Sequence, residues 1–100
     1  MSVYFIAEIK VNDPDTYSKY VSAVPELVKA AGGKYLSRGG EVKTVFGGWD
    51  PERLILIEFP SFAHARAFLD SPEYGRVKHF RETSTESRAI LIEGCATAAG

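Results

Sequence analysis

Carboxyl side chains are the first candidates for chemistry in this sequence. Glu8, Glu58 and Glu93 each stand in a short run whose apolar residues mark it as a β-strand. We place all three on the strand face turned away from the helices, beside apolar neighbours. Two carboxyl groups held close together do not both ionise easily, so one can keep a proton and act as a general acid or base. Glu8 and Glu58 are therefore the catalytic candidates.

The alternative for these glutamates is structural. They would then sit at strand ends wetted by solvent, or pair with Arg38, Arg53 or Arg88. Ion pairs of this kind perturb titration without any catalytic role.

A second set of candidates suits ligand binding rather than proton transfer. Arg38 and Arg81 offer planar forks of donors that match a carboxylate, and the hydroxyls of Ser71 and Tyr74 could orient a small anionic or oxygenated ligand. The competing interpretation makes Ser71 a helix cap before Pro72 and Tyr74 a core aromatic whose hydroxyl reaches the rim.

Metal and cofactor sites are not indicated. His64 and His79 have no cysteine or carboxylate at ligand spacing, so we expect no metal site. Cys95 has no neighbouring base in the sequence, which disfavours a nucleophilic role. Gly39-Gly40 and Gly47-Gly48 are doublets outside a strand-to-helix context, so we also expect no nucleotide cofactor.

The composition predicts an ordinary globular domain. The chain has 100 residues, 12 basic and 13 acidic side chains and a net charge of −1, so we expect neither nucleic acid nor membrane as a partner. No apolar stretch approaches the roughly 18 residues of a membrane span. A single cysteine suits a reducing compartment, and a cytoplasmic location is expected.

The elements that position the candidates begin with a strand and a long helix. The strand covers Val3 to Val11. Asn12-Asp13-Pro14 then supplies a capping side chain and a proline at the first helical position, and Gly32-Gly33 ends the helix. Pro25 removes a hydrogen bond to Val21 and is expected to kink it.

The middle of the chain predicts a β-hairpin. Its first strand starts at Tyr35, and we expect Gly39-Gly40 to be a bulge that lets the strand continue to Phe46; a tight turn is the alternative. The turn over residues 47–51 leads into the strand Leu54 to Phe59. Trp49 is expected to anchor this turn; the alternative is an exposed tryptophan that serves an interface.

The last third predicts a broken helix and a closing strand. Ser61 caps a helix expected to bury Phe62, Ala65, Phe68 and Leu69. Asp70-Ser71-Pro72 stops this helix and restarts another turn or two bearing Tyr74, Val77 and Phe80. A polar turn over 83–87 precedes the strand Arg88 to Glu93. One domain over 1–94 and a flexible tail over 95–100 result.

Three of the expected strands are apolar on both faces, which favours a second copy as partner. Helices on one side of the sheet cover only one face. Burying apolar surface stabilises a protein by roughly 25 cal/mol per Å². If several hundred Å² of the other face stay exposed to water, many kcal/mol of this stabilisation are lost. We therefore expect a homodimer through the open sheet face.

The chain also resembles a known family, over Val3 to Gly94. The motifs that carry the resemblance are Tyr35, Arg38-Gly39-Gly40, Trp49-Asp50-Pro51-Glu52-Arg53, Glu58-Phe59-Pro60-Ser61, Ser71-Pro72-Glu73-Tyr74, Arg81 and Ile92-Glu93-Gly94. In order and spacing they resemble the uncharacterised-domain family numbered thirteen-thirty, within the dimeric α/β-barrel superfamily. The resemblance implies an α+β, ferredoxin-like βαββαβ sandwich with an antiparallel sheet, paired into a dimeric α/β barrel, and no established activity. It also raises the interest of Arg81, because the family pattern has an arginine in this segment.

Two functional hypotheses follow. In a ferredoxin-like sheet we expect the first and third strands to be adjacent and parallel, which would bring Glu8 close to Glu58. The first hypothesis is a homodimer that binds, and transforms by cofactor-free acid/base chemistry, a small organic acid or aromatic in a cavity between sheet and helices. The alternative is a catalytically silent dimerisation or binding module. A ligand cavity needs roughly 300 Å³ or more, and an interior filled by side chains would rule out the first hypothesis.

Overall fold

The computed structural model describes residues 1–95. Its elements follow the order β1 (Val3–Val11), α1 (Pro14–Ala30), β2 (Lys34–Arg38), β3 (Arg53–Phe59), α2 (Phe62–Asp70), α3 (Pro72–Ser84) and β4 (Thr85–Glu93). Most of the tail expected over 95–100 lies outside the described residues.

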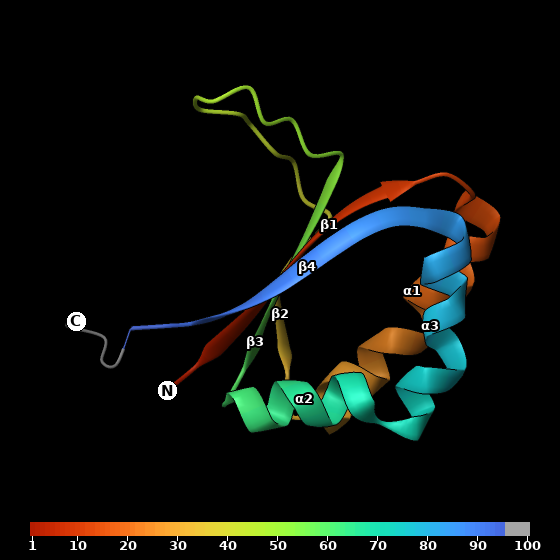
Figure 1. Ribbon diagram of the computed structural model, residues 1–100, viewed down its shortest axis with the longest axis vertical. Coiled ribbons are helices and arrows are strands. Elements are labelled where there is room, and N and C mark those ends of the chain that lie inside the picture. The colour runs from red at the N-terminus through yellow and green to blue at the C-terminus, as the bar shows by residue number, and fades with distance from the viewer. Residues whose placement is uncertain (96–100) are drawn as a thin grey trace.

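The strands form one antiparallel sheet in the order β2-β3-β1-β4. Figure 1 shows the helices gathered on one side of this sheet. The core lies between the two layers, where Val3, Ile57, Phe59 and Val28 are almost completely buried. The expected α+β order and the antiparallel sheet are confirmed.

The helix starts follow the local sequence signals. Asp13 caps α1 through a hydrogen bond to the Thr16 amide, and Ser61 caps α2 through the His64 amide. Gly32 adopts a φ of 82° directly after α1, a conformation that a residue with a Cβ rarely takes. The predicted helix boundaries are confirmed at these three points.

The expectation that β1 and β3 run parallel is wrong. They pair antiparallel, with Tyr4 opposite Glu58 and Glu8 opposite Leu54. The crossover through α1 makes β2 run in the direction of β1, and the β2–β3 hairpin then reverses the chain. Glu8 and Glu58 are therefore four residues apart along the strand pair, about 13 Å at 3.4 Å per residue.

The prediction of one long strand to Phe46 is also wrong. The chain leaves the sheet at Arg38, and the register irregularity lies earlier, between Tyr35 and Ser37. Residues 39–52 form a long connection that projects from the sheet away from the helices, as Figure 1 shows. β3 pairs only with the five residues of β2 on this side, so the segment up to Phe46 has no strand to pair with.

The last third differs from the expectation in two places. Phe62 is 45% exposed rather than buried, because it occupies the first position of α2 before the buried stripe begins at Ala65. Helix α3 continues to Ser84 and β4 starts at Thr85, so no polar turn over 83–87 separates them. The buried Ser84 carbonyl accepts the amides of Asn12 and Asp13, which fixes this junction against the start of α1.

The open face of the sheet carries apolar side chains, as predicted. Leu36, Ile90 and Ile92 are 46%, 60% and 49% exposed. The projecting connection adds Val45 and Phe46, both exposed by more than 85%. The single chain therefore leaves apolar surface on the sheet and on this connection uncovered.

Candidate functional site

A cavity of about 410 Å³ lies between the helices and the inner face of the sheet. Phe5, Ile9 and Ile57 of the sheet and Phe68 of α2 contribute apolar walls. The cavity exceeds the roughly 300 Å³ expected for a small-molecule site. The interior is therefore not filled by side chains, the condition that would have excluded a ligand.

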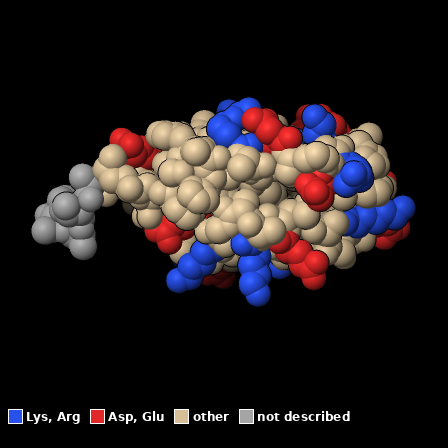
Figure 2. All heavy atoms as spheres, turned by 90° about the horizontal axis from the view of Figure 1, so that it is seen from below, with Lys and Arg blue, Asp and Glu red and all other residues tan. Residues whose placement is uncertain are grey.

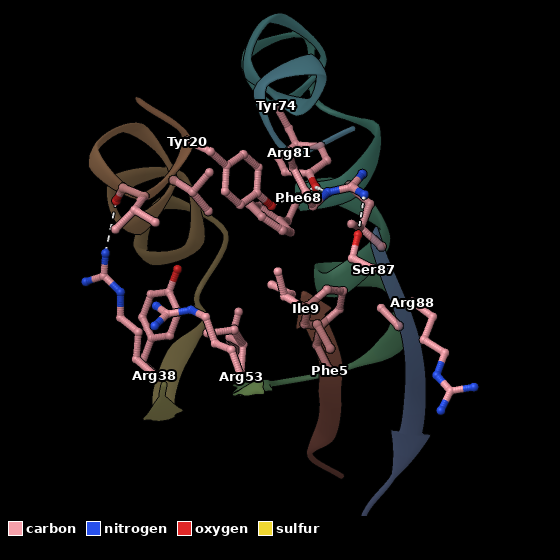
Figure 3. Close-up of a pocket in the computed structure, with 18 of the residues that line it drawn as sticks. Phe5, Ile9, Tyr20, Arg38, Arg53, Phe68, Tyr74, Arg81, Ser87 and Arg88 are labelled. Carbon is pink, nitrogen blue, oxygen red and sulfur yellow. Dashed lines mark hydrogen bonds between the residues drawn. The ribbon is translucent and has the colours of Figure 1, made fainter. Parts of the chain in front are cut away.

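Arg81, Tyr74 and Tyr20 form a polar cluster on this cavity (Figure 3). The Arg81 Nε donates to the Tyr74 hydroxyl at 3.3 Å, and an Arg81 terminal nitrogen donates to Ser87 Oγ at 3.2 Å. The hydroxyls of Tyr20 and Tyr74 are 2.9 Å apart. Tyr74 is buried between Phe68 and Tyr20, so packing fixes the cluster.

This cluster contains O–H and N–H groups that the hydrogen bonds described above do not use. The two phenols hold two protons, and their mutual hydrogen bond uses one of them. Among the described residues, neither hydroxyl has an acceptor for the other proton. Arg81 likewise uses two of its five N–H groups. The cluster can therefore donate to an oxygen acceptor placed in the cavity.

Burial fixes the protonation state of these groups. Desolvation, with a smaller contribution from neighbouring Tyr74, raises the pKa of Tyr20 far above its usual 10, so Tyr20 stays a neutral phenol. Burial by itself would lower the pKa of Arg81, but the Tyr74 and Tyr20 hydroxyls outweigh it and the net pKa is raised. Arg81 therefore remains a cation at any physiological pH.

Arg38 is held by a carbonyl group that a proline leaves free. Pro25 lies inside α1 and has no N–H, so the Val21 carbonyl lacks its usual helical partner. An Arg38 terminal nitrogen donates to this carbonyl at 2.9 Å, and its guanidinium lies 5.1 Å from the centre of the Tyr35 ring. The proline thus anchors Arg38 at the cavity, while α1 continues through it as one helix.

Arg53 is fixed beside Arg38 by Tyr17 and Gly39. Its Nε donates to the Tyr17 hydroxyl at 3.3 Å. A Cβ at Gly39 would come within 2.1 Å of the Arg53 guanidinium, and Gly39 has a φ of 73°. Glycine is therefore favoured here by the positive φ, and its lack of a side chain leaves room for the Arg53 guanidinium.

The cavity lining is strongly biased in charge. It includes Arg38, Arg53, Arg66, Arg81 and Arg88 but neither Asp nor Glu. Arg66 pairs with Asp70 at 3.0 Å, and Arg88 pairs with Glu8 at 2.6 Å and points away from the cavity in Figure 3. Within residues 1–95, the other three have no carboxylate within ion-pair distance. Their charge is available to a ligand.

Comparison with known families assigns the chain. Residues 2–95 match the model of a family described as "Domain of unknown function (DUF1330)". The chain belongs to this family. No match was found among the curated proteins compared.

Solved structures share the fold of this DUF1330 chain. A protein of unknown function from Rhodopseudomonas palustris has a TM-score of 0.77 at 17% identity, covering 96% of this chain and 84% of its own. A dimeric ferredoxin-like protein of unknown function from Thermobifida fusca has a TM-score of 0.68 at 17% identity, covering 94% and 92%. SnoaB, a cofactor-independent oxygenase from Streptomyces nogalater, has a TM-score of 0.67 at 13% identity, covering 99% and 98%. These likenesses establish a ferredoxin-like fold.

The structure brings together three of the ligand-binding candidates predicted from the sequence. Arg38, Tyr74 and Arg81 line one cavity of the DUF1330 domain. Ser71 does not line it, because its hydroxyl caps α3 at the Tyr74 amide and donates to the Phe68 carbonyl. The capping interpretation of Ser71 is confirmed.

The predicted pairing of the catalytic glutamates is wrong. Glu8 and Glu58 lie four residues apart on the open face, and neither lines the cavity. Glu93 is opposite Val3 and so lies on the helix side of the sheet, not on the open face. A catalytic role for Glu8 or Glu58 stays a prediction, in which each would act alone.

Glu8 instead links the sheet to the projecting connection. It accepts a hydrogen bond from the Trp49 indole at 2.9 Å and from Arg88 at 2.6 Å. These hydrogen bonds, with Trp49 the larger cause, lower the pKa of Glu8 below 4.5. Trp49 is thus an anchor for the connection, as its place in the sequence suggested.

Sequence reasoning did not select Arg53, Tyr17 or Tyr20 for the site. The signal was present for the tyrosines, because the stripe of α1 that packs on the sheet carries two hydroxyls among apolar residues. For Arg53 the sequence suggested an ion pair with a glutamate and a place in a family motif, but no contact with a ligand. Its alternation with the buried Ile55 and Ile57 would have placed it on the inner face.

The other sequence candidates are separate from the cavity. His64 is exposed, its ring Nδ1 lies 2.7 Å from Ser61 Oγ, and His79 and Cys95 are exposed. Within residues 1–95 no three His, Cys, Asp or Glu side chains gather as metal ligands. No helix in that range is long and apolar enough to cross a bilayer.

Proposed function

We propose that this DUF1330 protein binds a small organic anion with an apolar or aromatic body in the cavity between sheet and helices. The observation that carries the proposal is a 410 Å³ cavity whose lining contains arginines and phenols but no carboxylate. Apolar walls favour the body of such a ligand, and charge-assisted hydrogen bonds from a guanidinium favour its acid group.

The acid group is proposed to lie against Arg81. This arginine is more buried than Arg38, so solvent screens its charge less. Its orientation is fixed by Tyr74 and Ser87, and the Tyr20–Tyr74 pair adds one donor. A neutral phenol next to a permanent cation stabilises an oxyanion without accepting its proton.

The proposal is limited to binding. The titratable groups at the cavity are phenols and guanidinium groups, and burial keeps Tyr20 from acting as a base at neutral pH. SnoaB, which has the same fold, is a cofactor-independent oxygenase, but at 13% identity this likeness concerns the fold alone.

We further propose that the functional unit is a homodimer formed through the open sheet face. Exposed Leu36, Ile90 and Ile92 on that face, and Phe46 on the projecting connection, support this assembly. The Thermobifida fusca relative is described as dimeric. Both signs of charge are interspersed on the face of the molecule in Figure 2, which supports neither a nucleic acid nor an anionic membrane as partner.

Isothermal titration with 2-naphthoate and its uncharged amide tests the binding proposal. We expect the acid to bind at least about tenfold more tightly than the amide, because charge-assisted hydrogen bonds contribute roughly 1.5–3 kcal/mol. Arg81→Gln should remove most of this preference. Equal binding of acid and amide by the unmodified protein would contradict the proposal.

Arg76→Gln is the matched control, since Arg76 lies exposed on the same helix and does not line the cavity. Arg81→Lys retains the charge but not the bidentate fork and should bind with intermediate affinity. Thermal unfolding of each variant shows whether the fold is retained.

A further inference from the structure

The cavity has a cationic group at each of two ends. Arg81 comes from α3, whereas Arg38 ends β2 and Arg53 begins β3. Figure 3 shows Arg38 and Arg53 on one side of the opening and Arg81 with Ser87 on the other. A ligand with one acid group, bound at Arg81, would give the arginines of the opposite end no anionic partner.

A wall of tyrosines connects the two ends. Arg53 donates to the Tyr17 hydroxyl, and the Tyr17 ring stacks on Tyr20 with centroids 5.9 Å apart. Tyr20 meets Tyr74 edge to face at 6.1 Å, and Tyr74 accepts from Arg81. Such aromatic faces and edges favour a flat, ring-containing body lying along them.

The two arginines of the second end are held in place by hydrogen bonds within the protein. Arg38 is anchored on the carbonyl that Pro25 frees, and Arg53 is anchored on Tyr17 in the space that Gly39 leaves. Each arginine keeps several N–H donors beyond its anchoring bond. Holding long side chains in place in advance reduces the entropy lost when a ligand binds.

We propose that the ligand is a flat, ring-containing molecule with an acidic oxygen group at each end, one at Arg81 and the other at Arg38 and Arg53. The inference rests on the proposed function and names the ligand class within it. A cavity of about 410 Å³ lies near the lower end of the roughly 300–1,000 Å³ range of small-molecule sites, which suits one or two rings with two substituents.

Two matched pairs of probes test the second contact. Benzoate is compared with terephthalate, and 2-naphthoate with 2,6-naphthalenedicarboxylate, by isothermal titration against the full chain. Two lengths are used so that the spacing between the ends need not be assumed. We expect at least one diacid to bind about tenfold or more tightly than its monoacid.

Arg53→Gln separates the ends. The variant should lose the advantage of the diacid, so that its ratio of diacid to monoacid affinity falls toward one, because only the diacid reaches this end. Arg38→Gln is a second variant with the same expectation, and it is exposed enough to leave the fold intact. Arg76→Gln again serves as the control.

The outcomes distinguish the two proposals. If monoacids bind through Arg81 but neither diacid gains affinity, the two-ended ligand is wrong and the proposed function stands. If Arg53→Gln weakens mono- and diacid equally, the second contact is also wrong. If no acid binds in preference to its amide, the proposed function itself fails.

Discussion

At the scale of single residues, the site depends on which charges lack a partner. The arginines that pair with Asp70 and Glu8 are neutralised, whereas Arg38, Arg53 and Arg81 have aromatic rings, hydroxyls or carbonyls as neighbours. A cation surrounded by neutral groups keeps its attraction for an anion. This arrangement, more than the number of arginines, makes the cavity suitable for an acid.

The buried phenol of Tyr20 predicts a specific pH dependence of stability. Its pKa is raised in the folded state above the value of 10 in the unfolded chain. The unfolded chain therefore releases this proton first, and the stabilisation present below pH 10 is lost as pH rises beyond it. We expect the free energy of unfolding to fall more steeply above pH 10 in the wild type than in Tyr20→Phe.

Urea unfolding between pH 8 and pH 11 measures this difference. Tyr4→Phe is the control, because it removes the hydroxyl of a tyrosine that lies on the open sheet face, away from the cavity. If the free energy of unfolding changed with pH in the same way in the wild type and in Tyr20→Phe, the interpretation of Tyr20 as a buried, neutral phenol would be wrong.

Residue type, with the family resemblance in the case of Arg81, was enough to name Arg38, Tyr74 and Arg81 as ligand-binding candidates, because guanidinium and phenol groups can donate hydrogen bonds to an oxygen acceptor. It was not enough for the glutamates. Whether Glu8 meets Glu58 depends on strand direction and register, and both are set by the whole sheet. Local sequence does not contain that information.

At the scale of elements, α1 does more than cover the sheet. Its interior proline has an energetic cost, since proline in a helix is about 3 kcal/mol less favourable than alanine. In return the Val21 carbonyl becomes available to Arg38, which lies in another element. Stability and ligand affinity are therefore opposed at this position.

Pro25→Ala should separate the two effects. The alanine supplies an N–H to the Val21 carbonyl, so the free energy of unfolding should rise, by up to about 3 kcal/mol. Arg38 then loses its anchor, and diacid affinity should fall severalfold while monoacid affinity is unchanged. Urea unfolding and isothermal titration measure the two quantities.

Pro14→Ala is the matched control for this change. Pro14 occupies the first helical position, where a missing N–H costs no hydrogen bond. Both stability and diacid affinity should stay nearly constant in it. A Pro25→Ala protein with full diacid affinity would show that the freed carbonyl does not position Arg38.

Elements with strong local signals were predicted well, and the connection was not. Capping residues mark the starts of α1 and α2, Pro14 adds to the start signal of α1, and Gly32-Gly33 ends α1. The run up to Phe46 has strand-like composition, but a strand needs a neighbour, and β3 begins too late to supply one. The length of α3 was underestimated because its sequence lacks an apolar stripe, and only Tyr74 and Ser84 are buried.

At the scale of the whole molecule, the sheet has two faces with different uses. The inner face forms the floor of the cavity, and the open face carries exposed apolar side chains. This division separates Glu8 and Glu58 from the cavity arginines Arg38, Arg53 and Arg81. Arg88 and Ile90 of the open face also contribute to the edge of the cavity along β4, so assembly through this face would lie next to that edge.

Ile92→Asp tests the assembly. Ile92 is 49% exposed on the open face, so the substitution should be tolerated within one chain but costly in an interface that buries an unpaired charge. We expect light scattering to give twice the 11.0 kDa chain mass for the wild type and the single mass for the variant.

Phe62→Asp is the control for this substitution, because Phe62 is similarly exposed but lies on α2. It should leave the dimer intact. A wild-type protein that is a stable monomer would contradict assembly through the sheet.

The two-sided apolar pattern of the strands predicted an uncovered face from the sequence alone. The cavity on the other face was harder to locate, because its volume depends on how far the helices stand from the sheet. Tyr17, Tyr20, Phe68 and Tyr74, which line the cavity, pack against one another between the three helices. The spacing of apolar residues along the sequence does not predict how far the helices stand from the sheet.

The most direct test is a crystal structure of the protein with 2-naphthoate at saturating concentration. The account predicts the ring in the cavity along Tyr20 and the carboxylate within hydrogen-bond distance of the Arg81 guanidinium. Naphthoate on the open sheet face, or a cavity closed by side chains with no ligand inside, would contradict it.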